Sequence, residues 1–136
     1  MKSISNFTIN IIAGIVLTTL VAPGIAHTQQ AGIKRTNLQR HDLGIKGKEM
    51  VQIRVDIEPG IMFPRHTHPG EEIIYVLEGL LEYTIEGKAP VTLKAGDVFF
   101  VPAGTGHAVK NVGSGKGSEL ATYLIEKGKP LTEICK

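Results

Sequence analysis

The sequence predicts an all-β fold, with a single antiparallel sandwich or small barrel. After residue 50 the apolar residues come in short runs, and several runs show the every-second-residue spacing of a half-buried strand. Glycine, proline or serine bounds each run, and no convincing helical pattern follows residue 27. Many short strands joined by turn residues indicate a sandwich or barrel and argue against a layered α/β fold.

The clearest strand covers residues 51–57, where aliphatic residues alternate with polar ones until the Pro59-Gly60 turn. Further strands are expected over 72–77, 81–85, 91–94, 98–101, 107–112 and 119–125. Segment 27–50 is polar and irregular, which suits a leading arm or an edge strand. The glycine-rich run 113–118 lacks the strand-to-helix context of a phosphate-binding loop, so we expect a hairpin connection there.

Composition limits the size of the fold and the kinds of partner. A chain of 136 residues with 42% hydrophobic residues can build one core, so one domain is expected. The 15 basic and 13 acidic residues nearly cancel without forming a long run of either sign, which argues against binding of nucleic acid. Aromatic residues are sparse, so the stacking surfaces that single-stranded nucleic acids need are poorly supplied. A small neutral or weakly charged molecule is the expected partner.

Residues 1–26 are typical of a bacterial signal peptide, with Lys2 before an apolar stretch, a Pro23-Gly24 break and small residues before a cleavage point. The uninterrupted apolar run is shorter than the roughly 20 residues of a spanning helix, which makes an uncleaved membrane anchor the weaker alternative. We expect export to the periplasm or outside the cell, with no stable membrane association after cleavage. The single cysteine, Cys135, cannot form an intramolecular disulfide.

Four residues have the spacing of metal ligands. His66 and His68 are two apart, so on an extended strand both imidazoles point to the same face, roughly 6–7 Å apart at the backbone. The chain then bends at Pro69, and Glu72 on the next strand can turn its carboxylate toward the same point; His107 begins a later strand. An isolated His-x-His pair is more often a surface or core feature than a metal site, so the spacing alone leaves both interpretations open.

Two longer motifs resemble those of the cupin superfamily. Residues 60–79 match the first motif, G(x)5HxH(x)3E(x)6G, and residues 96–111 match the second, G(x)5PxG(x)2H(x)3N. All the specified positions are met, by Gly60, His66, His68, Glu72, Gly79, Gly96, Pro102, Gly104, His107 and Asn111. The chain therefore resembles a small single-domain type-2 cupin with both motifs intact.

The resemblance implies a jelly-roll β-barrel with one metal ion inside one mouth, held by His66, His68, Glu72 and His107. Glu71 competes with Glu72, but its side chain should face the opposite way, and the motif spacing selects Glu72. Three imidazoles and a carboxylate without a thiolate suit one divalent transition metal, which leaves Fe, Mn, Ni, Cu and Zn open. The implied organisation is signal peptide, arm or edge strand, cupin barrel and C-terminal tail, at residues 1–26, 27–50, 51–130 and 131–136.

The resemblance favours a dioxygenase-type oxidoreductase acting on a small enol, phenolic or diketone substrate, with Glu72 also serving as a base. The alternative is a non-redox site, in a metal-dependent isomerase or decarboxylase or in a ligand-binding module without turnover. A decarboxylase would want an additional proton donor, and none is identified in the sequence.

The residues around the motifs suggest the shape of the pocket and of the surface. A modest, mostly apolar pocket is expected from Met62, Phe63, Tyr83, Phe99 and Val109. No arginine is assigned to the inward face, because Arg65 has the opposite parity to His66 and His68, so a strongly anionic substrate is not expected. The motif glycines are expected in turns with positive φ, and Asn111 is expected to cap a turn.

His27 and His41 lie outside both motifs and are expected in solvent. The apolar run 73–77 leaves outward residues such as Tyr75, which suggests a homodimer.

Overall fold

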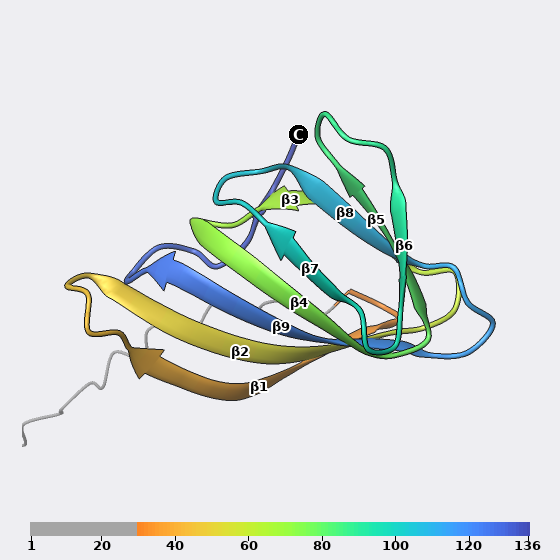
Figure 1. Cartoon of the computed structure of the whole chain (residues 1–136), viewed down its shortest axis with the longest axis horizontal. Coiled ribbons are helices and arrows are strands. Elements are labelled where there is room, and N and C mark those ends of the chain that lie inside the picture. The colour runs from red at the N-terminus through yellow and green to blue at the C-terminus, as the bar shows by residue number, and fades with distance from the viewer. Residues whose placement is uncertain (1–29) are drawn as a thin grey trace, which may run out of the picture.

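The computed structural model describes residues 30–136, and these residues form an all-β structure (Figure 1). The strands are β1 (Ile33–Asp42), β2 (Lys48–Ile57), β3 (Met62–Thr67), β4 (Gly70–Glu78), β5 (Leu80–Ile85), β6 (Val91–Lys94), β7 (Val98–Val101), β8 (His107–Asn111), β9 (Gly117–Glu126) and β10 (Glu133–Ile134). No helix in this part of the chain is long and apolar enough to cross a membrane. The predicted signal peptide at residues 1–26 and His27 lie outside the described residues.

The strands form two five-stranded antiparallel sheets, ordered β1-β2-β9-β4-β7 and β10-β3-β8-β5-β6. From β2 onward every connection passes from one sheet to the other except the β5–β6 hairpin. Figure 1 shows β2, β9 and β4 side by side, with β3, β8 and β5 forming the opposite layer. This crossing pattern is that of a jelly roll, so the predicted fold class is confirmed.

The side-chain alternation explains how the core forms. Every second residue of β2 is buried, as the sequence pattern predicts, and the strand begins at Lys48, three residues before the predicted start. The same alternation in β4 and β9 sends Ile74, Ala121 and Ile125 inward, where they meet Leu81 and Ile85 of the opposite sheet. The apolar core therefore lies between the two sheets and holds them together.

Two elements differ from the predicted strands: β3 holds His66 but ends before His68, which was expected on the same strand, and β10 was not predicted. β3 carries one of the motif histidines and pairs with β8, so that His66 and His107 are partners in register. β10 is a two-residue strand that pairs with β3 on its other side, opposite Thr67 and His66. The chain after residue 130 therefore packs onto the strand that carries His66.

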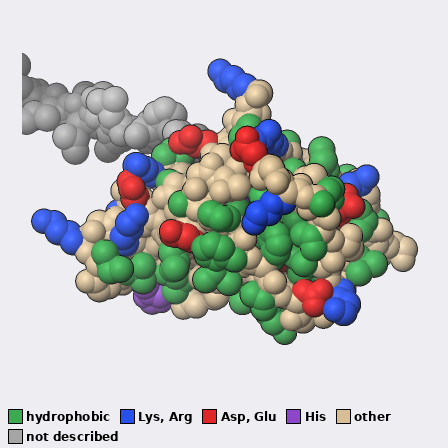
Figure 2. Space-filling model, turned by 45° about the horizontal axis from the view of Figure 1, so that its top comes forward, with side chains coloured by type: hydrophobic (Ala, Val, Ile, Leu, Met, Phe, Trp, Pro, Cys, Tyr) green, Lys and Arg blue, Asp and Glu red, His purple; other side chains and the backbone are tan. Residues whose placement is uncertain are grey.

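The outer face of β4 and β7 is apolar. Ile73, Tyr75 and Leu77 are 37%, 44% and 39% exposed, and they adjoin Val98 and Phe100 of β7. Hydrophobic side chains gather on the side of the molecule seen in Figure 2. The homodimer suggested by these residues stays a prediction.

The turns depend on the motif glycines and on Asn111. All four motif glycines have positive φ, as predicted, and Gly79 at 80° also lies against the neighbouring loop. A Cβ atom added to Gly79 would stand 2.6 Å from the carbonyl oxygen of Lys116. Asn111 is fully buried; its Nδ2 donates to the carbonyl oxygens of Ile57 and Gly115, and its Oδ1 accepts from the backbone of Gly113. The predicted capping role of Asn111 is confirmed.

Gly79→Ala should lower the free energy of unfolding by about 2 kcal/mol, because it combines a strained φ with a backbone clash. Gly115→Ala, in the adjacent loop, is the matched control: an added Cβ there meets nothing within 4 Å, so a change of only about 0.5 kcal/mol or less is expected. Urea unfolding of both variants measures the difference. Equal stabilities would contradict this account of the turn.

Candidate metal centre

The four predicted site residues come from strands β3, β4 and β8 and from the β3–β4 turn, and all are buried. His66 lies on β3, His68 in the β3–β4 turn, Glu72 on β4 and His107 at the start of β8. Their exposed fractions are 3%, 3%, 3% and 1%. Because β4 belongs to the opposite sheet from β3 and β8, both layers of the barrel contribute to the cluster. Glu71 is half-buried on the other face of β4, so the predicted difference between the two glutamates is confirmed.

The structure brings the four side chains together. One ring nitrogen from each of His66, His68 and His107 lies within 4.8 Å of those of the other two. Glu72 Oε2 is 3.0 Å from His107 Nε2 and 3.4 Å from His68 Nε2. The compact cluster is thus made by the three histidines, and the carboxylate adjoins two of them.

Backbone carbonyls fix the protonation of all three rings. His66 Nδ1 donates to the carbonyl oxygen of Pro64 at 2.8 Å, and His107 Nδ1 donates to that of Thr105 at 2.9 Å. His68 Nδ1 donates to the carbonyl oxygen of Leu131 at 2.6 Å. A carbonyl oxygen can only accept, so each Nδ1 carries the hydrogen and each neutral ring keeps an unprotonated Nε2. This outer hydrogen bond is the usual support of a metal-binding histidine.

Two inward atoms lack a hydrogen-bond partner. His68 Nε2 and Glu72 Oε2 are buried and unpaired within the described part of the chain, although they are only 3.4 Å apart. His68 Nε2 and Glu72 Oε2 are close enough for an ion pair if the ring is protonated, but they do not form a hydrogen bond. Buried polar atoms are rarely left unpaired. A divalent cation that accepts electron pairs from imidazole nitrogens and a carboxylate fits this donor set.

Charge and burial set the protonation states of His66 and Glu72. Burial, with the neighbouring His107 ring, lowers the pKa of His66 to about 3, against the weaker effect of the Pro64 carbonyl. Burial alone would raise the pKa of Glu72, but hydrogen bonds and positive charge from His107 and His68, when these rings are protonated, outweigh it and hold this pKa well below its ordinary value. At neutral pH the site therefore offers a neutral imidazole beside a charged carboxylate.

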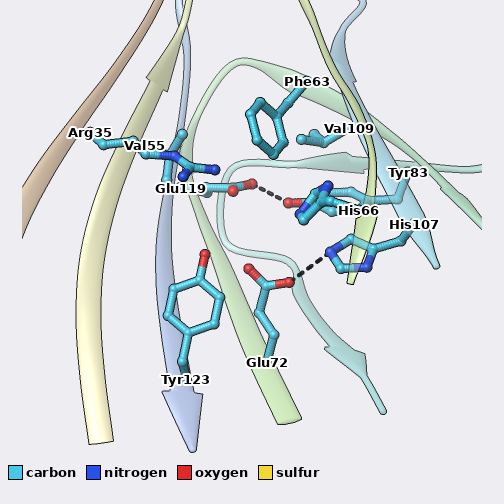
Figure 3. A pocket seen from close by; sticks show the side chains of 10 residues that line it. All are labelled: Arg35, Val55, Phe63, His66, Glu72, Tyr83, His107, Val109, Glu119 and Tyr123. Carbon is cyan, nitrogen blue, oxygen red and sulfur yellow. Dashed lines mark hydrogen bonds and ion pairs between the residues drawn. The ribbon is translucent and has the colours of Figure 1, made fainter. Parts of the chain in front are cut away.

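A second polar group, which sequence reasoning missed, lies in the same cavity. The hydroxyl of Tyr83 on β5 donates to Glu119 Oε2 on β9 (Figure 3). Burial, followed by the negative charge of Glu72, raises the pKa of Glu119 to about 8, against the weaker effects of Tyr83 and Arg35. The available signal was parity: Glu119 shares the inward face of β9 with Ala121 and Tyr123.

The lining of the cavity has more apolar than polar surface, as predicted, but it also includes charged side chains that were not expected there. Ten side chains line a cavity of about 280 Å³, solvent at its mouth included: Arg35, Val55, Phe63, His66, Glu72, Tyr83, His107, Val109, Glu119 and Tyr123 (Figure 3). Three of these are apolar. The prediction holds for Phe63, Tyr83 and Val109, but Met62 is half exposed, and Phe99 packs beside the Tyr83 ring without lining the cavity.

The expectation that no arginine faces inward was wrong. Arg65 does point outward, where it pairs with Glu86 at 2.8 Å. Arg35 on β1, however, lines the cavity and lies over the ring of Phe63, 4.4 Å from its centre. Segment 27–50 showed no periodicity that could assign its residues to a face, so parity could not place Arg35.

A jelly roll that encloses a cluster of histidines is typical of small metal-binding barrels. Comparison with known proteins places the chain in a family of this kind. The cupin domain model matches residues 53–123, and the chain belongs to the cupin family. Germin-like protein subfamily 2 member 2 of Arabidopsis thaliana is 41% identical over 75 residues, which is 52% of this chain and 34% of that protein. Dimethylsulfoniopropionate lyase DddQ of Ruegeria pomeroyi is 43% identical over 51 residues, 38% of this chain and 25% of the lyase.

Among solved structures, an oxalate oxidase in complex with glycolate aligns with a TM-score of 0.62 and 26% identity, covering 79% of this chain and 57% of the oxidase. The chain spans only about a third of the length of the germin-like relative and a quarter of that of the lyase. The family and fold are therefore shared, while the whole-protein activities of these relatives belong to longer chains.

Removing the Glu119 carboxyl should change how the stability of the metal-free protein depends on pH. Its folded pKa of about 8 lies above the ordinary value of 4.5, so its stabilising contribution is complete below about pH 4.5 and is lost as pH rises through 8. The pH dependence of the His66 contribution is opposite. This contribution to stability is present above pH 6.5, the ordinary pKa, and is lost as the pH falls toward 3.

Comparison of Glu119→Gln with the wild type isolates the first effect, since the amide has a similar shape and no charge. Between pH 5 and 9 the variant should gain stability relative to the wild type by a few kcal/mol. Urea unfolding in the presence of a chelator measures it. Parallel stability curves would show that Glu119 is not a buried acid with a raised pKa.

Proposed function

We propose that this cupin is a metalloenzyme that holds one divalent transition metal through the Nε2 atoms of His66, His68 and His107 and the carboxylate of Glu72. The observation that supports it best is that three imidazoles, each oriented by an Nδ1 hydrogen bond to a backbone carbonyl, converge beside a buried carboxylate. The donor set leaves Fe, Mn, Ni, Cu and Zn open. A metal bound there would supply Lewis-acid or redox chemistry to a small substrate.

The protein residues around the cluster have separate tasks in this proposal. Glu72 keeps a negative charge beside the imidazoles, while Glu119 and Tyr83 hold a proton on the other side of the cavity. Phe63 and Val109 give the cavity apolar walls. The enclosed part of the cavity has room for only about one water molecule, which favours a compact substrate.

For the reaction class we favour a dioxygenase-type oxidoreductase acting on a small enol, phenolic or diketone substrate, with Glu72 as a base. Similarity to an oxalate oxidase supports oxidoreductase chemistry on a small molecule. A non-redox lyase, isomerase or decarboxylase is the second candidate. The Tyr83–Glu119 pair favours it, because it offers the extra proton donor that such a reaction wants, as does the likeness to a lyase.

Loss of a ligand should abolish metal binding. His66→Ala and His107→Ala should each reduce the metal content from about one ion per chain toward zero, because each removes a nitrogen from the cluster. Glu71→Gln on the outward face of β4 is the control and should leave the content unchanged. Elemental analysis after dialysis measures it. Full metal content in both histidine variants would rule out the assignment.

Oxygen consumption separates the two reaction classes. Protein loaded in turn with each of the five metals is mixed with small enols, phenols, diketones and hydroxy acids, and an oxygen electrode follows uptake. Dioxygenase chemistry predicts uptake with a redox-active metal and none with Zn²⁺, which has no redox chemistry. Turnover that persists without oxygen, or with Zn²⁺ bound, would instead support the lyase or isomerase.

A further inference from the structure

The charge of Arg35 is not matched by any ion pair in the described part of the chain. All four arginines of the sequence lie between residues 30 and 136. Arg40, Arg54 and Arg65 each pair with a carboxylate, at 2.7, 3.0 and 2.8 Å. Within the same residues, no ion pair or side-chain hydrogen bond involves Arg35, the arginine that lines the cavity. Five N–H donors are therefore available there.

Packing positions this guanidinium. It lies over the ring of Phe63, which comes from the opposite sheet and itself packs edge-on against the ring of His66 at 4.5 Å between centres. A guanidinium stacked on an aromatic face keeps its N–H groups in the plane and free to bind an anion. Arg35 is on an edge strand and exposed to solvent, so it stands at the mouth of the cavity.

The carboxyl groups in the cavity leave this charge available. Glu119, whose side chain points to the same side of the cavity as Arg35 in Figure 3, accepts a hydrogen bond from Tyr83 and forms no ion pair with Arg35. Its raised pKa of about 8 keeps it mainly protonated at neutral pH. Glu72 lies beside His107 and His68, at 3.0 and 3.4 Å, and forms no ion pair with Arg35.

We propose that Arg35 is the substrate-anion receptor of this site, and that the substrate is a small carboxylate with an oxygen on the neighbouring carbon, as in a 2-hydroxy or 2-oxo acid. The carboxylate would pair with the guanidinium at the mouth, and the neighbouring oxygen would face His66, Glu72 and His107. An arginine side chain can bind a carboxylate in a two-pronged geometry that a lysine cannot reproduce. This inference rests on the proposed function and names a small acid as its substrate in place of the enol, phenol or diketone favoured above.

Binding of glycolate to Zn²⁺-loaded protein tests the proposal, since Zn²⁺ avoids oxidation during calorimetry. Arg35→Gln keeps a planar group over Phe63 without the charge and should weaken glycolate binding by about tenfold, the loss expected for a charge-assisted pair. Arg35→Lys should recover only part of it. Lys34→Ala, which removes a positive charge from the adjacent outward position, is the control and should bind as the wild type does.

Glycolamide, the neutral analogue, should bind to the wild type more weakly than glycolate does. Arg35→Gln should bind glycolamide and glycolate equally. Equal glycolate binding by the wild type and Arg35→Gln would overturn the proposal, as would the absence of glycolate binding by the wild type.

A second measurement tests anion binding by Arg35 without requiring that the protein binds a metal. The Nε–H resonance of Arg35 in metal-free protein should shift when glycolate is added. If zinc is not retained, the proposed function fails, and a glycolate-dependent shift still supports Arg35 as the anion receptor. An unmoved resonance in metal-free protein, together with equal binding by the loaded wild type and Arg35→Gln, would exclude it.

Discussion

Polar side chains buried inside a small barrel must find partners, because an unpaired buried group costs several kcal/mol. Three imidazoles and the carboxyl groups of Glu72 and Glu119 line the cavity between the sheets of this protein. The outer nitrogens of the rings use backbone carbonyls, and Glu119 uses Tyr83. The inner atoms of His68 and Glu72 have no such partner among the described residues. The unpaired inner atoms therefore lower the stability of the barrel, and a cation bound between them would remove that cost.

The two acids of the cavity, Glu72 and Glu119, differ in the charge they carry. Glu72 adjoins two imidazoles, which when protonated hold its pKa below the ordinary range despite burial. Glu119 lies in the same cavity without such partners, and burial and the charge of Glu72 raise its pKa to about 8. Environments that push two titratable groups apart commonly separate a charged binding group from a proton donor. In the proposed enzyme, this division gives one carboxylate to the metal and one carboxyl group to the substrate.

The sequence predicted the barrel and the four-residue cluster because both leave local traces: alternation marks the strands, and fixed spacing marks the ligands. Arg35, Glu119 and the carbonyl of Leu131 left no comparable trace. Arg35 lies on an edge strand with one buried residue, so alternation is weak there. Glu119 could have been found by parity, but a buried acid contradicts the usual preference of that residue for solvent. The Leu131 contact spans 63 residues and involves a backbone atom, which no side-chain pattern reveals.

That distant carbonyl links the site to the order in which the chain is made. His66, His68, Glu72 and His107 lie within residues 60–111, yet the ring of His68 is oriented by Leu131, which is synthesised after all of them. While the chain emerges from the ribosome, His68 is free to take either tautomer. It gains its inward lone pair only when the segment after β9 docks beside β3. A cation bound by this arrangement would therefore meet a complete site only after that docking, and a fusion placed close behind Ile134 would lie next to the contact that completes it.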